Sequence, residues 1–512
     1  MPSIVRFGSR ERTHDEVKAR ARRAAAGFSG LGVGPGDVVA TILRNDTPFL
    51  EATLAAGYLG AYLTPLNWHA TADEAAYILA DCDPNAVVIH ADLLPRYEEQ
   101  LAGRKVFVVE PPAELLNVYG LSPAGSGWEG AHQAWDAFIE SNADIEPAPV
   151  EAPGAMIYTS GTTGHPKGVR RAPPTAEEAA RLREVVGALF GTADANPSQL
   201  VALAAAPLYH STPNAWTPHF FNIGATLIIH DRFDAESMLR EIERSRVTHL
   251  LAVPTMFVRL LKLPADVRSR YDVSSLRFVM HGAAPCPPDI KRAMIEWWGP
   301  VIWEHYGGTE TGAVTLCDSR EWLANPGTVG RAFLDSELAI LDEQGKPVPP
   351  RVIGEVACRR FTVADFTYNK DPGKREKADR DGLVSLGDHG YLNDDGFLFL
   401  SGRSAEVVIS GGVNIYPAEI EAELIKMSGV ADCAVFGIPD EEFGESLCAF
   451  VQPQADANLT ADEVREYLRP KVSSYKLPKR VEIRQELPRE DSGKIFKRKL
   501  REPFWAEAGR AI

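Results

Sequence analysis

The stretch YTSGTTGHPKGV at residues 158–169 contains three glycines, four Ser or Thr residues and a single lysine, Lys167, and it overlaps the end of an apolar run, AMIYT, at 155–159. Small residues let backbone N–H groups approach an anion and hydroxyl groups add donors, so this composition is typical of a phosphate-binding nest after a strand. It is not a Walker A loop, because Pro166 precedes the lysine and Gly168 follows it. Taken alone, the stretch is equally consistent with a flexible surface turn.

On both sides of this stretch, helix-like and strand-like segments alternate over the first four hundred residues. Apolar residues at helical spacing predict helices over 13–31 and 234–246, and Asp46 is placed to cap a helix with Pro48 in its first turn. Short apolar runs predict strands at 38–43, 86–90, 105–110, 155–159, 199–206, 225–230, 249–253 and 276–282. Interleaved strands and helices indicate mainly parallel sheets covered on both faces. We therefore expect a large α/β domain of stacked parallel or mixed sheets.

The sequence pattern changes near residue 400. The segment YLNDDGFLFLSGR at 391–403 predicts a hairpin around an Asn-Asp-Asp-Gly turn. Further elements are predicted downstream: a helix at 417–427, strands at 431–438 and 447–453, and a helix from Thr460. We expect an N-terminal domain at 1–402, a hinge at 403–406 and a small, mobile α+β domain at 407–512.

Charge is unevenly distributed along the chain. The 512 residues carry a net charge of −16, which argues against general nucleic-acid binding. Residues 469–501 nevertheless hold 12 Lys and Arg against 4 Asp and Glu. This basic segment is either a solvated surface or a mobile element that brings cations to an anionic ligand.

Targeting, disulfide and metal signals are not readable in the sequence. Charged residues occupy the N-terminal region where a secretory signal needs an apolar core, and no apolar run approaches the roughly 20 residues that span a bilayer. The six cysteines form no CxxC pair, and the twelve histidines form no HExxH pattern. A reduced, cytoplasmic protein without integral membrane contact is the simplest expectation.

Four further motifs accompany the glycine-rich stretch. HGAAP at 281–285 ends a predicted strand with small residues against which a flat ring can lie, and HYGGTETG at 305–312 combines an aromatic, a hydroxyl and a carboxylate. Asp388 and Arg403 flank the predicted hairpin, and Lys494 stands on a Gly-containing loop near the end of the chain. Each motif is weak by itself, whereas their order and spacing are highly specific.

Together these motifs resemble the adenylate-forming superfamily, which contains acyl- and aryl-CoA synthetases, adenylation domains and firefly-type luciferases. The resemblance extends from GVGPGDVVA at 32–40 to GKIFKRKL at 493–500. Within it, PLYHSTPNAW at 207–216 and SGGVNIYPAEIE at 410–421 are most similar to fatty and medium-chain acyl-CoA synthetases. The implied enzyme attaches AMP from ATP to a hydrophobic fatty or arylalkanoic acid and then transfers the acyl group to CoA.

The resemblance implies a role for each motif. Lys494, Glu310 and Thr309 are the expected catalytic residues, with Lys494 placed at the α-phosphate, and Thr159 and Glu310 are the expected Mg²⁺ ligands. The implied nucleotide-binding residues are Thr159, Ser160, Gly161, Thr162, Thr163, Gly164, Lys167, Gly282, Ala283, Ala284, His305, Tyr306, Gly307, Thr309, Asp388, Arg403 and Lys494. ATP, Mg²⁺ and coenzyme A are the expected cofactors and co-substrates.

The remaining expected sites concern the acid, the thiol and domain rotation. The implied acyl-pocket residues are His210, Trp216, Phe220, Gly282 and Gly307. The implied CoA face consists of Ser410, Gly411, Gly412 and Tyr416. Glu406 is the expected hinge residue, at a position where the family usually has Asp or Lys. The expected partners are small molecules, and a homodimer is compatible with the sequence.

Several alternatives stay open at the level of the sequence. Trp216 and Phe220 are equally consistent with an acyl gate and with ordinary core packing, and the acceptor could be a carrier-protein phosphopantetheine instead of free CoA. A non-catalytic nucleotide-binding relative is a further alternative. The chain also departs from the family pattern at Leu386, where Thr is usual, and over 171–198, which replaces a short Thr-His-Arg/Lys connection.

Overall fold

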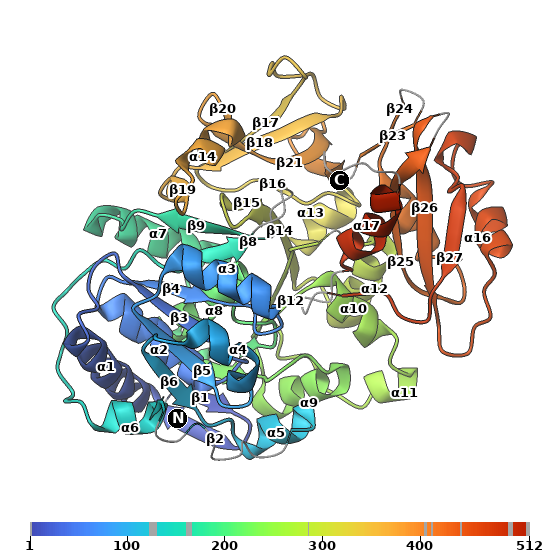
Figure 1. The fold of residues 1–512 in the computed structure, drawn as a ribbon. Coiled ribbons are helices and arrows are strands. Elements are labelled where there is room, and N and C mark those ends of the chain that lie inside the picture. The colour runs from blue at the N-terminus through green and yellow to red at the C-terminus, as the bar shows by residue number, and fades with distance from the viewer. Residues whose placement is uncertain are drawn as a thin grey trace.

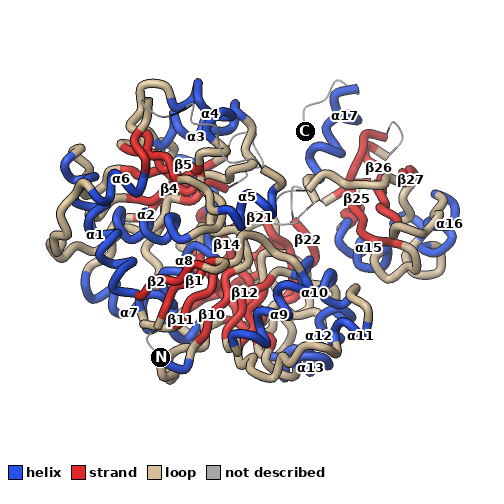
Figure 2. The backbone as a smooth tube through the Cα atoms, turned by 90° about the horizontal axis from the view of Figure 1, so that it is seen from below, coloured by secondary structure: helices blue, strands red, loops and turns tan. Residues whose placement is uncertain are grey.

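The computed structural model describes residues 3–507 except 122–127, 129–130, 160–165, 285, 404–406, 411–412, 441–442 and 490–494. A large N-terminal domain of sheets and helices is followed by a smaller C-terminal domain, and both views of the backbone show the smaller one set to one side (Figure 1, Figure 2). In the described part of the chain, no helix is long and apolar enough to span a membrane.

The largest sheet has nine strands, of which the inner ones are parallel. Its order is β16 (Arg331–Ala332), β15 (Gly312–Cys317), β14 (Ile302–Gly308), β13 (Phe278–His281), β12 (His249–Ala252), β10 (Val201–Ala204), β11 (Thr226–Ile229), β1 (Ile4–Phe7) and β2 (Arg10–Thr13). The run from β14 to β1 is parallel, and β15, β16 and β2 add antiparallel pairs at the two edges. Parallel neighbours bring the carboxyl ends of β13 and β14 to one edge, where the predicted nucleotide motifs begin.

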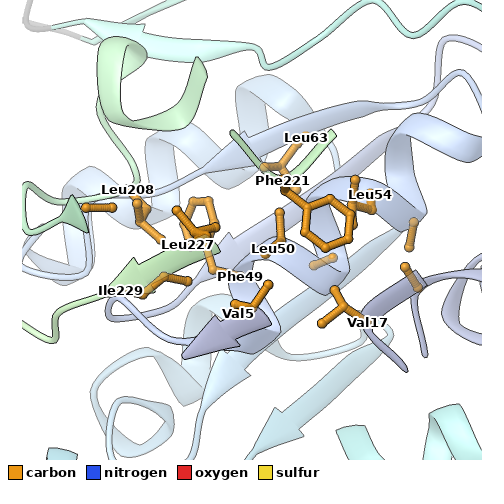
Figure 3. Packing of buried hydrophobic residues seen from close by; sticks show 14 of the residues in the cluster. Val5, Val17, Phe49, Leu50, Leu54, Leu63, Leu208, Phe221, Leu227 and Ile229 are labelled. Carbon is orange, nitrogen blue, oxygen red and sulfur yellow. The ribbon is translucent and has the colours of Figure 1, made fainter. Parts of the chain in front are cut away.

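A second sheet has five strands, and all of its pairs are parallel. Its order is β4 (Tyr62–Pro65), β3 (Val38–Ile42), β5 (Ala86–His90), β6 (Val106–Val109) and β7 (Gln133–Ala134). The main hydrophobic core contains residues of both sheets and of several helices, and Figure 3 shows Val5 and Leu227 of the first sheet facing Phe49 and Leu50 of α2 (Thr47–Tyr58). The predicted stacking of α/β sheets is thereby confirmed.

Fourteen α-helices are described between residues 3 and 378. They are α1 (His14–Gly30), α2 (Thr47–Tyr58), α3 (Ala72–Cys82), α4 (Leu94–Leu101), α5 (Ala113–Tyr119), α6 (Trp135–Glu140), α7 (Ala176–Leu189), α8 (Ser211–Asn222), α9 (Ala235–Ser245), α10 (Pro254–Leu261), α11 (Ala265–Arg268), α12 (Pro288–Trp298), α13 (Ser319–Ala324) and α14 (Pro372–Ala378). The predicted cap at Asp46 is present, because its side chain accepts from the N–H of Thr47. Thr13, which was not predicted as a cap, closes a capping box with Glu16.

Two smaller sheets differ from the predicted parallel pattern. One contains β17 (Ser336–Leu341), β18 (Gly354–Arg360), β21 (Leu383–Leu392), β20 (Asp379–Arg380) and β22 (Leu398–Arg403); the other contains β19 (Phe366–Tyr368), β9 (Lys167–Arg171) and β8 (Ile157–Thr159). All their pairs are antiparallel. The helix–strand alternation expected over four hundred residues is therefore interrupted by the β8–β9 hairpin and gives way beyond β14 to antiparallel strands, because short connections favour hairpins over crossovers. The predicted hairpin at 391–403 is confirmed as β21 and β22.

The C-terminal domain is an α+β unit with a core of its own. Its sheet contains β24 (Val413–Ile415), β23 (Val408–Ser410), β26 (Gly444–Pro453), β25 (Val430–Asp440) and β27 (Arg480–Ile483), and its helices are α15 (Pro417–Leu424), α16 (Ala461–Leu468) and α17 (Lys497–Glu507). The buried cluster of this sheet draws every member from residue 408 onwards. The domain contacts the larger one at several points, among them a hydrogen bond of 3.0 Å from Lys262 Nζ to the carbonyl of Ala431. The bounds at residues 402 and 407 stay predictions.

Candidate active site

The glycine-rich stretch forms a hairpin of β8 and β9 in which Thr159 pairs with Lys167. The loop between them, with Ser160, Gly161, Thr162, Thr163 and Gly164, lies outside the described residues. A glycine is required at position 168 for steric reasons, because a Cβ there would lie 2.8 Å from Cζ of Tyr158. The Tyr158 hydroxyl in turn donates to the Asp81 carboxylate of α3. The two ends of the predicted phosphate loop are thus fixed side by side.

Lys167 lies close to a second predicted site residue. Its Nζ stands 5.2 Å from the centre of the Tyr368 ring, and the Tyr368 hydroxyl donates to Oε1 of Glu310 at 3.1 Å. Burial lowers the pKa of Lys167, and Lys374 nearby acts in the same direction, whereas Glu310 raises it. Tyr368 therefore contacts Lys167 of the β8–β9 hairpin through the face of its ring and the expected magnesium ligand Glu310 through its hydroxyl.

Glu310 lies in the short turn between β14 and β15. The guanidinium of Arg171 donates from Nη2 to the carbonyl oxygens of Thr309 at 2.7 Å and of Glu310 at 2.6 Å. Within the same turn, a Cβ at Gly308 would lie 2.8 Å from Leu386, so the departure at Leu386 packs directly against this turn. The β8–β9 hairpin and the Glu310 turn are joined by direct hydrogen bonds.

The strand before this turn carries Tyr306, whose hydroxyl donates to Oδ2 of Asp388 at 2.7 Å. Both residues are buried, and Asp388 on β21 pairs in register with Arg403 on β22. The side chain of Arg403 lies outside the described part of the structure. Gly307 is required by packing, because a Cβ there would lie 1.9 Å from the carbonyl oxygen of Gly312. Three predicted nucleotide-binding positions, Tyr306, Asp388 and Arg403, are therefore adjacent.

The end of β13 supplies small residues that lie beside His305. A Cβ at Gly282 would lie 2.4 Å from Cε1 of His305, so the imidazole packs directly on this glycine. Ala283 has a φ of +68°, a left-handed conformation that non-glycine residues seldom adopt. Because Nδ1 of His305 lies 3.0 Å from the carbonyl oxygen of His281, that nitrogen carries the proton, and burial lowers the pKa of His305 to about 4. The ring is thus neutral, with Nε2 as its acceptor.

A buried ion pair lies just below these loops. Lys291 on α12 and Glu304 on β14 approach to 2.5 Å between Nζ and Oε2, and both are almost fully buried. His281 Nε2 lies 3.6 Å from the same carboxylate oxygen. The pair connects α12 to the strand that leads into Tyr306. No sequence motif pointed to it.

Three of the expected acyl-pocket residues, His210, Trp216 and Phe220, lie in helix α8 or directly before it, whereas Gly282 follows β13 and Gly307 lies in β14. His210 is the residue before the first turn of α8, and the Ser211 hydroxyl accepts from that of Thr309 at 3.3 Å, which connects the start of α8 to the Glu310 turn. Trp216 and Phe220 are fully buried, with ring centres 4.5 Å apart. Of the two interpretations, core packing accounts for their contacts; the acyl-pocket assignment stays a prediction.

The residues predicted for domain rotation and thiol binding are only partly described. Lys494, Glu406, Gly411 and Gly412 lie outside the described residues. Ser410 ends β23 and pairs with Gly444 of β26. Tyr416 faces the large domain, where a Cβ at Gly402 would lie 3.1 Å from its ring. The predicted CoA face is therefore next to β22, the strand that carries Arg403.

Sequence reasoning missed Arg171, Tyr368 and Ser211. Arg171 falls in the segment noted as a departure from the family pattern, so its position beside the phosphate stretch was the available signal. Tyr368 comes from a strand nearly two hundred residues away and reaches the site only because β19 pairs with β9. Ser211 directly follows the expected pocket residue His210.

The donor set fits Mg²⁺. Among the described residues, no group of three or more His, Cys, Asp or Glu side chains could hold a metal ion. Magnesium commonly binds through one or two carboxylates together with substrate phosphates and waters. A single carboxylate, Glu310, beside the hydroxyl-bearing Thr159 hairpin corresponds to that arrangement.

Comparisons with known proteins agree with this geometry. The AMP-binding enzyme family matches residues 2–365, and the AMP-binding enzyme C-terminal domain matches residues 419–494. A feruloyl-CoA synthase of an Amycolatopsis species is 33% identical over 505 residues, which are 98% of this chain and 96% of the relative. The fatty acid–[acyl-carrier-protein] ligase ScoC of Streptomyces coeruleorubidus is 28% identical over 525 residues, covering 100% of this chain and 95% of the relative. The ATP-bound RpMatB-BxBclM chimera B3 has a TM-score of 0.84 at 26% identity and covers 99% of this chain and 97% of its own. The chain therefore belongs to the adenylate-forming superfamily of AMP-binding enzymes, as an enzyme of the acyl-CoA synthetase type.

Proposed function

We propose that this enzyme is an ATP-dependent carboxylic acid–CoA ligase for a hydrophobic acid, either a fatty or an arylalkanoic acid. The observation that carries the proposal is the convergence of the β8–β9 hairpin, the Glu310 turn and the Tyr306–Asp388 hydrogen bond at one edge of the large sheet. These are the parts needed to hold the phosphates, the metal, and the adenosine of one nucleotide.

In the first half-reaction, an oxygen of the acid attacks the α-phosphorus of ATP and pyrophosphate leaves. Adenine would lie against Tyr306 and the small residues Gly282–Ala284, while Asp388 would accept from the ribose hydroxyls. Lys167 and the donors of its hairpin would hold the β- and γ-phosphates. Bound Mg²⁺ would neutralise phosphate charge, with Glu310 and Thr159 as its protein ligands.

Two anions meet in this step, so a cation at the α-phosphate contributes most to the rate. Lys494 of the C-terminal domain is the proposed cation. Losing a group that stabilises developing charge costs on the order of 3–4 kcal/mol, or about 10²–10³ in rate.

In the second half-reaction, the CoA thiol attacks the acyl carbon of the adenylate and AMP leaves. The C-terminal domain would rotate about Glu406 to replace Lys494 by the face that carries Ser410, Gly411, Gly412 and Tyr416. Contact of Tyr416 with Gly402 supports this assignment, because it places that face beside the strand of Arg403.

A carrier-protein phosphopantetheine is the second candidate acceptor. It is favoured by one observation, the similarity over the whole chain to a fatty acid–[acyl-carrier-protein] ligase. The higher identity to a feruloyl-CoA synthase favours free CoA.

A pyrophosphate-release assay tests the proposal with a panel of fatty and aryl acids, each with and without CoA. We expect adenylate formation with at least one hydrophobic acid and a thioester product when CoA is added. Pyrophosphate release without formation of a CoA thioester would reject free CoA as the acceptor and favour a carrier-protein phosphopantetheine. No release with any acid, from protein that binds ATP, would reject catalysis on this panel.

A further inference from the structure

We propose that Arg171 is a positioning residue that fixes the Glu310 turn against the phosphate-loop hairpin and thereby sets the affinity for the magnesium–nucleotide complex. The inference rests on the proposed function, because it takes Glu310 as the metal ligand and the β8–β9 hairpin as the phosphate site.

The side chain of Arg171 makes three hydrogen bonds to backbone carbonyls of two separate segments. Nη2 donates to Thr309 at 2.7 Å and to Glu310 at 2.6 Å, and Nε donates to Ala364 at 3.2 Å. Arg171 is also the last residue of β9, the strand that begins with Lys167. One guanidinium therefore joins the phosphate hairpin, the metal-ligand turn and the segment before β19.

Tyr368 completes this arrangement from the neighbouring strand. Its hydroxyl holds Oε1 of Glu310 at 3.1 Å, and Tyr368 pairs with Val169 of β9. The backbone of the turn is thus held by Arg171 and its carboxylate by Tyr368, from two paired strands. A metal ligand that is oriented by such outer contacts binds more tightly than a free one, and loss of one contact typically costs about 10–100-fold in metal affinity or activity.

The planar, fork-shaped donor set of arginine suits this task. Its fixed N–H directions can reach two neighbouring carbonyls from one nitrogen and a third from another, whereas lysine offers three donors on a single atom. Carbonyls supply only partial negative charge, so burial lowers the pKa of Arg171, whereas the nearby carboxylates of Glu310 and Asp365 raise it. Replacement by lysine should therefore keep the charge and restore only part of the geometry.

Arg170, the adjacent residue on β9, provides a matched control. It lies over the Tyr62 ring at 4.5 Å and donates to the carbonyl of Gly36 at 3.4 Å, away from the Glu310 turn. Arg170→Met removes the same charge from the same strand without removing any described contact to Thr309 or Glu310.

The experiment is calorimetric titration of the full-length protein with α,β-methylene-ATP, which cannot release pyrophosphate, over a series of Mg²⁺ concentrations. For Arg171→Met we expect the Mg²⁺ concentration at half-maximal binding to rise roughly 10–100-fold, with little change in the weak binding without metal. Arg171→Lys should recover part of this loss, and Arg170→Met should bind like wild type. Thermal melting of each variant checks that the protein is folded.

The outcomes separate the two proposals. Wild-type protein that binds the analogue in a Mg²⁺-dependent manner, together with equal behaviour of Arg171→Met and Arg170→Met, would overturn the role of Arg171 alone. Equal losses with and without Mg²⁺ would also overturn it, since they indicate a general structural effect. Wild-type protein that fails to bind the analogue at every Mg²⁺ concentration would overturn the proposed function and this inference together.

Discussion

Removing Lys291 leaves Glu304 as an uncompensated charge next to the loops that are proposed to bind the nucleotide. Their charged atoms are 2.5 Å apart, and the side chains are 0% and 4% exposed. At an effective dielectric constant of about 20, the attraction at this distance is roughly 6–7 kcal/mol. The desolvation of both ions offsets much of this attraction. Removing one partner of a buried ion pair typically costs about 3–5 kcal/mol, and this is the loss of stability that we expect.

This loss should be measurable as a lower melting temperature. With an unfolding entropy of about 2.1 cal/mol/K per residue over about 400 residues, Lys291→Met should lower Tm by roughly 4–6 °C. The exposed pair of Arg270 and Asp266, also at 2.5 Å but with side chains 60% and 69% exposed, is the matched control. Arg270→Met should cost no more than about 1 kcal/mol.

The penalty for Lys291→Met should also depend on pH. Burial raises the pKa of Glu304, whereas Lys291 lowers it, so the variant's carboxyl favours the proton more strongly than the wild-type one. A carboxyl whose folded pKa is raised stabilises the fold when protonated, and this contribution disappears as pH rises through the folded pKa. The other titratable groups beside it stay neutral, because burial lowers the pKa of His281 and raises those of Cys286 and Cys317.

The Tm difference between wild type and Lys291→Met should therefore widen as the pH rises above the ordinary titration range of a glutamate carboxyl, because the folded pKa of Glu304 is raised. Melting curves at several pH values, followed by circular dichroism, measure it directly. A variant that melts like Arg270→Met, or whose Tm deficit is constant with pH, would refute the claim that Glu304 is a buried, lysine-dependent carboxylate.

Three further predictions concern the reaction. Lys494→Ala should slow adenylate formation by about 10²–10³, measured as ATP–pyrophosphate exchange, and a wild-type rate would contradict the proposed role. Glu406→Pro should leave adenylation largely intact and block thioester formation; equal impairment of both half-reactions, assayed separately, would reject the hinge. Tyr306→Phe removes the 2.7 Å hydrogen bond that positions Asp388. A hydrogen bond to a charged group contributes about 1.5–3 kcal/mol, so the affinity for ATP, measured by calorimetry, should fall by roughly 10–100-fold. An unchanged affinity for ATP would contradict the proposal that Asp388 binds the ribose hydroxyls.

Local sequence patterns predicted the elements that are built from continuous segments. The apolar run at 86–90 is β5 to the residue, because a strand buried on both faces reads as an uninterrupted apolar run. Helix α9 lies within the predicted range 234–246, and its N-cap Asp234 accepts from the N–H of Ser237. The order of the motifs along the chain was sufficient to single out Tyr306, Glu310 and Asp388.

Contacts between distant strands were not accessible in the same way. Tyr368 follows no motif, and its hydrogen bond to Glu310 exists only because β19 pairs with β9 across nearly two hundred residues. Lys291 likewise sits in an amphipathic helix, where a lysine is usually exposed, and its full burial follows from the carboxylate that Glu304 contributes. Side chains whose role is set by a partner far along the chain carry no local signal.

The two unpredicted cations hold the site in physically different ways. Lys291 neutralises a buried carboxylate, so its removal changes the charge state and should appear in stability and pH dependence. Arg171 binds carbonyl oxygens, which cannot titrate, so its removal should leave the charge of the turn intact and change its position. If both variants lost metal–nucleotide affinity to the same extent, the distinction would fail, because general loosening of the β14 region would then explain both.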